Sequence, residues 1–134
     1  MPTDSTPSAA PSAAARWTPP LVWVALILVA TSWPSINVGP ETLGFDKVFH
    51  FTAYAVFAGL SLRATLRPRD WGTVVTVIVV VALFGAVDEW HQSFIPGRSM
   101  SLGDLIADSS GAVVGSFAVR LLPFLTPRRP ASAS

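Results

Sequence analysis

The chain of 134 residues contains no cysteine, and only 13% of its residues are charged. Without cysteine, neither a disulfide framework nor a thiolate metal site can form. The net charge of +1 leaves no basic surface of the kind that binds nucleic acid. By contrast, 51% of the residues are hydrophobic, the mean hydropathy is +0.52, and the apolar residues lie in long blocks. Such blocks are typical of a membrane protein and not of a soluble domain.

Four apolar spans are visible, at about residues 17–33, 48–66, 71–90 and 102–125. Each is close to the roughly 20 residues that an α-helix needs to cross a bilayer. Trp17 and Trp33 bracket the first span and Trp71 and Trp90 the third, as expected for rings at the two membrane interfaces. We therefore predict an all-α integral membrane bundle of four transmembrane helices over residues 16–125. The Pro- and Ser-rich segments 1–15 and 126–134 are predicted to be disordered tails.

The cations predict the orientation of these spans, because short loops rich in Lys and Arg stay in the cytoplasm. Seven of the nine cations lie on one side: Arg16, Arg63, Arg67, Arg69, Arg120, Arg128 and Arg129. Both termini are therefore expected in the cytoplasm, with the first and third loops facing outward. An alternative is that the first span is a cleaved signal peptide, since Ala30, Thr31 and Ser32 resemble a cleavage site. The remaining loops keep the same sides in either case.

The third span ends in an unusual group of polar residues, DEWHQ. Asp88 and Glu89 stand at the C-terminal end of the expected helix, where the helix dipole disfavours acids by about 0.3 to 1 kcal/mol each. Gln92 follows them at spacings that put all three side chains on one helical face. We interpret them as functional residues; the alternative is that they are solvated groups at the membrane edge.

The second span opens with Asp46, His50 and Tyr54 at intervals of four residues, which place them on one stripe of a helix. Structural roles are the alternative here, with Asp46 as a helix cap and Tyr54 as an interfacial anchor. On the fourth span, Ser101 and Asp104 have the spacing of a capping box, whereas Asp108 has no such structural explanation.

Small residues recur every four positions along the fourth span, at Gly103, Ala107, Gly111 and Gly115, and predict close contact with another helix. Asp108 adjoins this stripe, so we expect its carboxylate to face the bundle interior or a wet cavity rather than acyl chains.

The loop before the fourth span carries Pro96, Gly97 and Arg98. Arg98, Lys47 and two helix N-termini are expected to form an anion cradle on the outer side. Asp46, His50, Asp88 and Glu89 are candidate catalytic residues for acid and base chemistry. A divalent cation is the cofactor that such oxygen and imidazole ligands favour, with Asp46, His50 and Glu89 as candidate ligands. Cation ligands beside anion binders suit a phosphate headgroup.

Three motifs together, DKVFHFTAYAVFAGL, DEWHQSFIPGRS and SLGDLIADSSGAVVG, resemble the VanZ family of small bacterial membrane proteins over about residues 20–122. The resemblance implies a helical bundle in the bacterial cytoplasmic membrane and, for the family's namesake, reduced susceptibility to the glycopeptide teicoplanin. The family positions that it assigns to this chain are Asp46, Lys47, His50, Tyr54, Asp88, Glu89, Gln92, Pro96, Gly97, Arg98, Asp104 and Gly111. Asp108 departs from the family, where Asn is common at this place.

Three functions are open on the sequence. One is a membrane enzyme that acts on a lipid-linked envelope component, with Lys47, Tyr54, Gln92, Arg98, Asp104 and Asp108 as ligand-binding residues. The second is a non-catalytic module that binds a lipid headgroup, a cell-wall precursor or a glycopeptide. The third is a proton or ion pathway through the buried ionisable residues. No HExxH motif and no nucleophile elbow specifies a reaction class.

Overall fold

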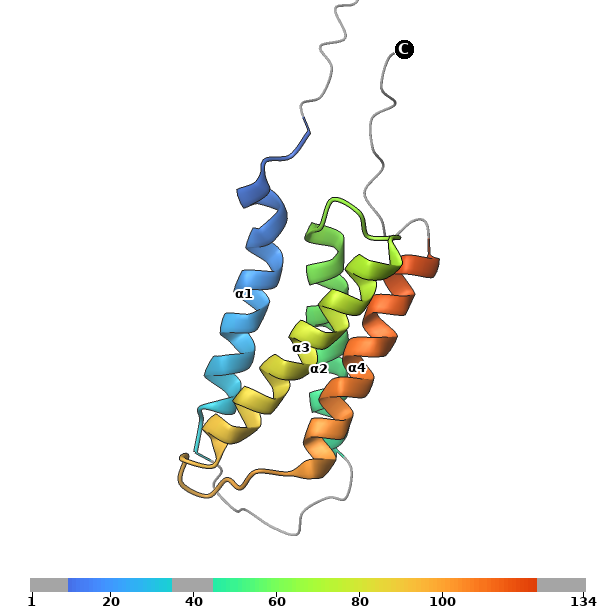
Figure 1. The fold of residues 1–134 in the computed structure, drawn as a ribbon. Coiled ribbons are helices and arrows are strands. Elements are labelled where there is room, and N and C mark those ends of the chain that lie inside the picture. Colours follow the sequence, from blue (N-terminus) through green and yellow to red (C-terminus); the bar gives the residue numbers. More distant parts are fainter. Residues whose placement is uncertain (1–9, 35–44, 123–134) are drawn as a thin grey trace, which may run out of the picture.

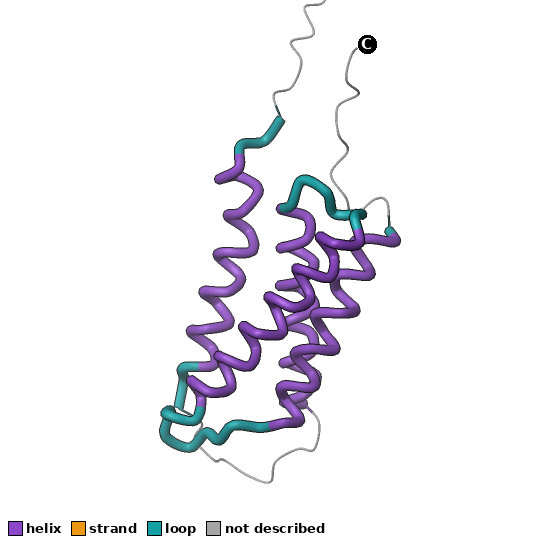
Figure 2. The backbone as a smooth tube through the Cα atoms, in the orientation of Figure 1, coloured by secondary structure: helices purple, strands orange, loops and turns teal. Residues whose placement is uncertain are grey.

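The computed structural model describes residues 10–34 and 45–122, and every regular element within them is an α-helix (Figure 1, Figure 2). The helices are α1 (Ala13–Thr31), α2 (Phe45–Ala64), α3 (Trp71–Gln92) and α4 (Leu102–Leu121). They form one bundle in which each helix runs opposite to the one before it in the chain (Figure 1). The all-α prediction is confirmed for the described part of the chain.

The alternating direction gives the bundle two distinct ends. At the polar end, α1 and α3 end while α2 and α4 begin (Figure 1). At the other end, α1 and α3 begin while α2 and α4 end; we call it the arginine end, after Arg16, Arg63, Arg67, Arg69 and Arg120. Cations and acids that are interspersed in the sequence are therefore separated along the bundle axis.

Short polar side chains determine where three of the helices begin. Ser12, Asp70 and Ser101 each accept a hydrogen bond from the backbone N–H three residues further on, at 3.2, 2.9 and 3.2 Å. Such caps satisfy backbone donors that the first turn leaves without partners. Because Ser12 caps α1, this helix begins at Ala13, inside the segment that we predicted to be a disordered tail. The prediction is wrong for residues 13–15, and most of both tails lies outside the described residues.

Three of the described helices, α1, α3 and α4, are long and apolar enough to cross a membrane. Three of the four predicted spans are thus candidate membrane spans by length and composition. The 20 residues of α2 include Asp46, Lys47, His50 and Arg63, which lower its hydropathy, and α2 is not among the three. That α2 also crosses the bilayer stays a prediction.

The closest helix pair is α2 and α4, and the small-residue stripe makes this contact possible. A Cβ atom added at Gly111 would overlap the backbone carbonyl oxygen of Phe51, and one added at Gly115 would overlap that of Ala55. No side chain larger than hydrogen fits at either place while the backbones stay where they are. The predicted close contact is confirmed, and its partner is α2.

Helix α1 lies on the outside of the bundle. Only 11% of its apolar span is buried inside the protein, compared with 39% for α4. A hydrogen bond of 2.9 Å from Trp23 Nε1 to the carbonyl oxygen of Ala53 joins α1 to α2. The apolar core lies mainly between α2, α3 and α4 and includes Ala58, Leu62, Val74, Val81 and Ala112.

Candidate functional site

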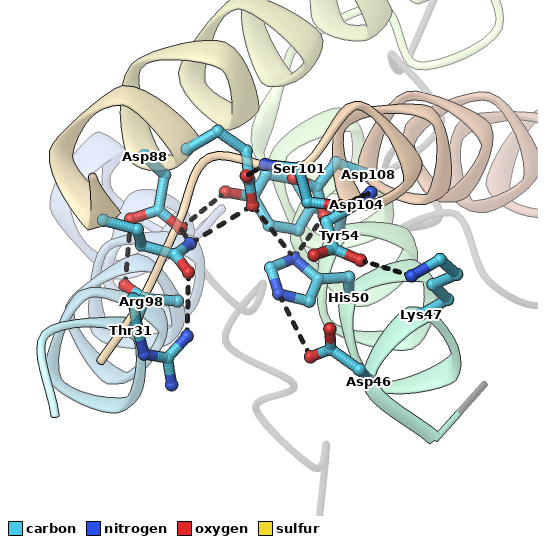
Figure 3. A network of polar contacts seen from close by, with 12 residues as sticks. Thr31, Asp46, Lys47, His50, Tyr54, Asp88, Arg98, Ser101, Asp104 and Asp108 are labelled. Atoms are coloured by element: carbon cyan, nitrogen blue, oxygen red, sulfur yellow. Dashed lines mark hydrogen bonds and ion pairs between the residues drawn. The ribbon is translucent and has the colours of Figure 1, made fainter. Parts of the chain in front are cut away.

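A network of polar side chains fills the polar end of the bundle (Figure 3). Its members come from all four helices and from the loop between α3 and α4. They are Thr31, Asp46, Lys47, His50, Tyr54, Asp88, Glu89, Gln92, Arg98, Ser101, Asp104 and Asp108. All ten residues predicted from the sequence are in this network, because helices that alternate in direction bring their four ends together.

The side chain of Asp88 on α3 forms hydrogen bonds with residues of α1, α2 and α3. This side chain is 1% exposed. Oδ1 accepts a hydrogen bond of 2.9 Å from the Thr31 hydroxyl on α1. Oδ2 accepts one of 3.1 Å from the Tyr54 hydroxyl on α2 and one of 3.2 Å from Gln92 Nε2 on α3 itself. Three donors compensate for much of the cost of burying this carboxylate. Tyr54 is 1% exposed and points inward, so it is not an interfacial anchor.

Glu89 joins α3 to the start of α4. Its Oε2 accepts a hydrogen bond of 2.7 Å from the backbone N–H of Ser101, and its Oε1 accepts one of 3.4 Å from Gln92 Nε2. In a complete capping box, the side chain of Asp104 would accept from the N–H of Ser101. Only half of the predicted box is present: Ser101 caps Asp104, but Glu89 replaces the reciprocal acceptor. Asp104 is thereby left to interact with α2.

His50 lies among three carboxylates, two at Nδ1 and one at Nε2. Its Nδ1 is 3.0 Å from Asp108 Oδ1 on α4 and 4.0 Å from Glu89 Oε1 on α3. On the other edge of the ring, Nε2 is 3.8 Å from Asp46 Oδ1, whose side chain is 64% exposed. The imidazole itself is buried and lies parallel to the ring of Tyr54. One histidine thus connects the surface of the polar end with its interior.

The two basic residues of the network are engaged within the protein. Lys47 Nζ is 3.3 Å from Asp104 Oδ1. The guanidinium of Arg98 donates from a terminal nitrogen to Gln92 Oε1, at 2.8 Å, and from Nε to the carbonyl oxygen of Trp33, at 3.1 Å. In Figure 3, Lys47 and Arg98 are on opposite sides of His50. They flank the acids and do not form one compact cradle.

Two groups in the described part of the chain have the donor atoms of a metal site. Asp46, His50 and Asp104 form one group, and His50, Glu89 and Asp108 form the other, with donor atoms within 4.8 Å of one another in each. The predicted ligands Asp46, His50 and Glu89 are divided between these groups, because Asp46 and Glu89 face opposite edges of the imidazole. Each group gains an acid from α4 that the predicted set did not include.

Sequence reasoning did not identify two participants as site residues. Thr31 was interpreted only within a cleavage site, yet its hydroxyl contacts Asp88. Ser101 was interpreted as a cap, but its backbone N–H also binds Glu89. For Thr31, the only available signal was its position as a threonine at the end of an otherwise apolar span. For Ser101 there was none, because every residue except proline has a backbone N–H.

A cavity lies away from this network, toward the arginine end. It has a volume of about 540 Å³ and lies between α1, α2 and α3. Its walls are mainly apolar and include Trp17, Val24, Phe57 and Val81. None of the ten predicted site residues lines it. The polar network and this cavity thus lie in different parts of the bundle.

Several helices that can cross a membrane, together with a buried polar network at one end of the bundle, define a multi-pass membrane protein with an enclosed polar site. The sequence model of the VanZ/LLP1 family matches residues 3–123, and the chain belongs to this family. The match confirms the predicted resemblance and extends it further toward the N-terminus. No curated protein and no solved structure shows significant similarity to the chain.

Proposed function

We propose that the protein crosses the bacterial cytoplasmic membrane four times, with both termini in the cytoplasm and the polar end facing outward. The support is the segregation of charge: Arg63, Arg67 and Arg69 lie at or near the connection of α2 to α3, and Arg16 and Arg120 lie at the same end. Positive residues in short loops are retained in the cytoplasm. The crossing of α2 is supported by its 20 residues and its position against α4.

At the outward end, the protein binds the anionic headgroup of a lipid-linked envelope component. The observation that carries this proposal is that buried acids, a histidine and two cations meet at one end of a membrane-spanning bundle. Arg98 has five N–H donors and uses two for its described contacts, so donors remain for a phosphate. Lys47 is 54% exposed and can turn to a ligand. Both cations lie where a lipid headgroup reaches the membrane surface.

The contacts distinguish the roles of the four candidate catalytic residues. Asp88 accepts three hydrogen bonds and is suited to holding α1, α2 and α3 together. His50 and Glu89 have polar neighbours on more than one helix and are the better candidates for proton transfer, with Asp46 next to the imidazole at the surface. An enzyme would use this pair on the bound headgroup, whereas a non-catalytic module would only hold it. In either form, the protein is expected to lower susceptibility to a glycopeptide such as teicoplanin.

Headgroup binding is tested with Arg98→Ala in vesicles that contain a polyprenyl-phosphate lipid. Arg67→Ala, at the arginine end, is the matched control, because it removes the same charge far from the network. Loss of one charge-assisted contact predicts weaker binding by about 10-fold or more, from roughly 1.5 to 3 kcal/mol. Equal binding by both variants and the unchanged protein would refute the proposal.

Glu89→Gln then separates the two forms of the function. An enzyme should lose turnover of the lipid and keep its binding, whereas a binding module should show no turnover before or after the change. The teicoplanin susceptibility of cells that express each variant gives the corresponding phenotype. An unchanged phenotype in cells with Arg98→Ala would show that headgroup binding and resistance are unrelated.

A further inference from the structure

The interior of the polar end holds more acids than bases. Asp88, Glu89, Asp104 and Asp108 are each at most 7% exposed, and His50 is the only base among the described residues that is comparably buried. Lys47 pairs with Asp104 from the surface, and three donors surround Asp88. Buried charge is costly unless it is paired or coordinates a metal. Glu89 accepts hydrogen bonds from the N–H of Ser101 and from Gln92, so Asp108 is the acid with the fewest partners.

Asp108 is the least satisfied of them. It is 0% exposed, and its only described side-chain partner is His50, through Oδ1. Its second oxygen, Oδ2, is buried and has no hydrogen-bond partner. Protonation does not remove this deficit, because a carboxylic O–H at this oxygen would also need an acceptor. A buried polar atom without a partner requires an explanation, and an absent ion is one.

The donor atoms around Asp108 are arranged for a cation. Asp108 Oδ1 and Glu89 Oε1 approach the same ring nitrogen of His50, Nδ1, at 3.0 and 4.0 Å, and the three donors are within 4.8 Å of one another. Each donor comes from a different helix, α2, α3 or α4. Movement of the donors around one ion requires only small shifts of side chains, because the helices already bring them together.

The other edge of His50 lies near a carboxylate of the kind that a metal-binding histidine uses as its outer partner. A histidine that binds a metal through one nitrogen usually donates its second N–H to a carboxylate or carbonyl, which fixes the tautomer. Here Nε2 is 3.8 Å from Asp46 Oδ1, which is beyond hydrogen-bond distance, but the exposed Asp46 side chain needs only a small movement to accept from it. Asp46 is thus a positioning residue for the imidazole and not a ligand.

We infer that His50 Nδ1, Glu89 and Asp108 bind one divalent transition-metal ion inside the polar end. One imidazole with two carboxylates and no thiolate suits Zn²⁺ or Mn²⁺. Three protein ligands leave coordination positions open, as in catalytic sites. Headgroup binding by Arg98 and Lys47 belongs to the proposed function and does not require this ion, and binding of the ion does not require the headgroup.

The test is titration of the chelator-treated full chain with Mn²⁺ alone, in a detergent that contains no phosphate. One ion is expected per chain. Asp108→Asn and Glu89→Gln keep the side-chain shapes and should weaken binding by more than about 100-fold, whereas Asp46→Asn should weaken it by about 10- to 100-fold, as removal of an outer partner does. Circular dichroism of each variant verifies that the helices are retained.

Two controls make the assignment specific. Asp104→Asn removes an acid from the competing group of Asp46, His50 and Asp104 and should change the affinity by only a few-fold, about that of an indirect effect. Pulsed electron paramagnetic resonance of bound Mn²⁺ should show coupling to an imidazole nitrogen. The coupling should persist in His91→Gln, which removes the only other histidine, and disappear in His50→Gln.

The inference is overturned if the unchanged chain binds no ion at one site, if Asp108→Asn binds as well as the unchanged chain, or if Asp104→Asn alone abolishes binding. Because no lipid phosphate is present, these outcomes do not depend on the headgroup proposal. Normal Mn²⁺ binding together with unchanged lipid binding by Arg98→Ala would refute the proposed function and leave the metal site intact.

Discussion

Helices α4 and α1 both pack against α2, but by different means. The contact of α4 is backbone against backbone, because Gly111 and Gly115 have no side chain to separate it from Phe51 and Ala55. The contact of α1 is made by side chains, and a cavity of about 540 Å³ remains between α1, α2 and α3. The close approach of α4 to α2 brings the polar side chains of these two helices together. Helix α1, by contrast, covers the polar network from one side.

The loosely packed helix nevertheless ends in two polar contacts. Thr31 donates to Asp88, and the carbonyl oxygen of Trp33, just after α1, accepts from Arg98. A helix that is held by few apolar contacts can thus be tied to the rest of the bundle at one end. This difference predicts that changes at the α4 contact act on the whole bundle, whereas changes on α1 act locally.

The largest effect is expected from Gly115→Ala and Gly111→Ala. The added methyl group would overlap a backbone carbonyl oxygen of α2, which cannot move aside, so the two helices must separate. Overpacking typically lowers the free energy of unfolding by about 1 to 3 kcal/mol. We expect these two variants to reach or exceed the upper end of that range. Thermal unfolding in detergent measures it. Gly59→Ala is the control, because its Cβ would meet its nearest neighbours at ordinary distances of 3.5 and 3.6 Å. If all three variants unfold alike, the small-residue contact does not limit stability.

A smaller effect is expected from Thr31→Val on α1. Valine keeps the shape of threonine but removes the donor to Asp88 Oδ1, which has no other described hydrogen-bond partner. Leaving one buried acceptor unsatisfied costs about 1 to 3 kcal/mol. Thr18→Val is matched to it, since Thr18 is an exposed residue of α1 that bonds only to its own helix, at Ala14. Urea unfolding of the two variants should differ; equal stabilities would show that α1 is not tied to the network through Thr31.

The smallest effect is expected at the arginine end, where Asp70 caps α3. Hydrogen bonds from the backbone N–H and the hydroxyl of Thr73 hold the pKa of Asp70 below its ordinary value of 3.8. Because the pKa is lower in the folded state than in the unfolded state, the ionised carboxylate stabilises the fold at pH values above the ordinary pKa. This contribution is lost as the pH falls through the lowered pKa.

Asp70→Asn should therefore be slightly less stable than the unchanged chain near neutral pH, and the difference should vanish in acid. Unfolding at the two pH values measures this change. Ser12→Ala removes a cap with no titratable group, so its effect should be the same at both. A difference for Asp70→Asn that persists in acid would show that the charge of Asp70 does not stabilise α3.

Much of the fold follows from the sequence because lipid offers no hydrogen bonds to the backbone. A bilayer accepts backbone only when its hydrogen bonds are made internally, so long apolar blocks become helices. The exception is instructive: residues 13–15 look like a tail by composition, but a single hydroxyl at Ser12 extends α1 over them. Capping depends on one side-chain contact, which composition does not register.

The sequence by itself determined that the polar residues of this protein would meet. Asp46, Asp88 and Asp104 stand near the ends of apolar segments joined by short connections, and such segments must alternate in direction through a bilayer. Only the tertiary structure decided which groups pair, such as His50 with Asp108 and Glu89 with the N–H of Ser101. The physical reason is distance: the approach of α4 to α2 depends on glycines packed against backbone, and a change of about 1 Å there would alter the contacts between these two helices, such as His50 with Asp108 and Lys47 with Asp104.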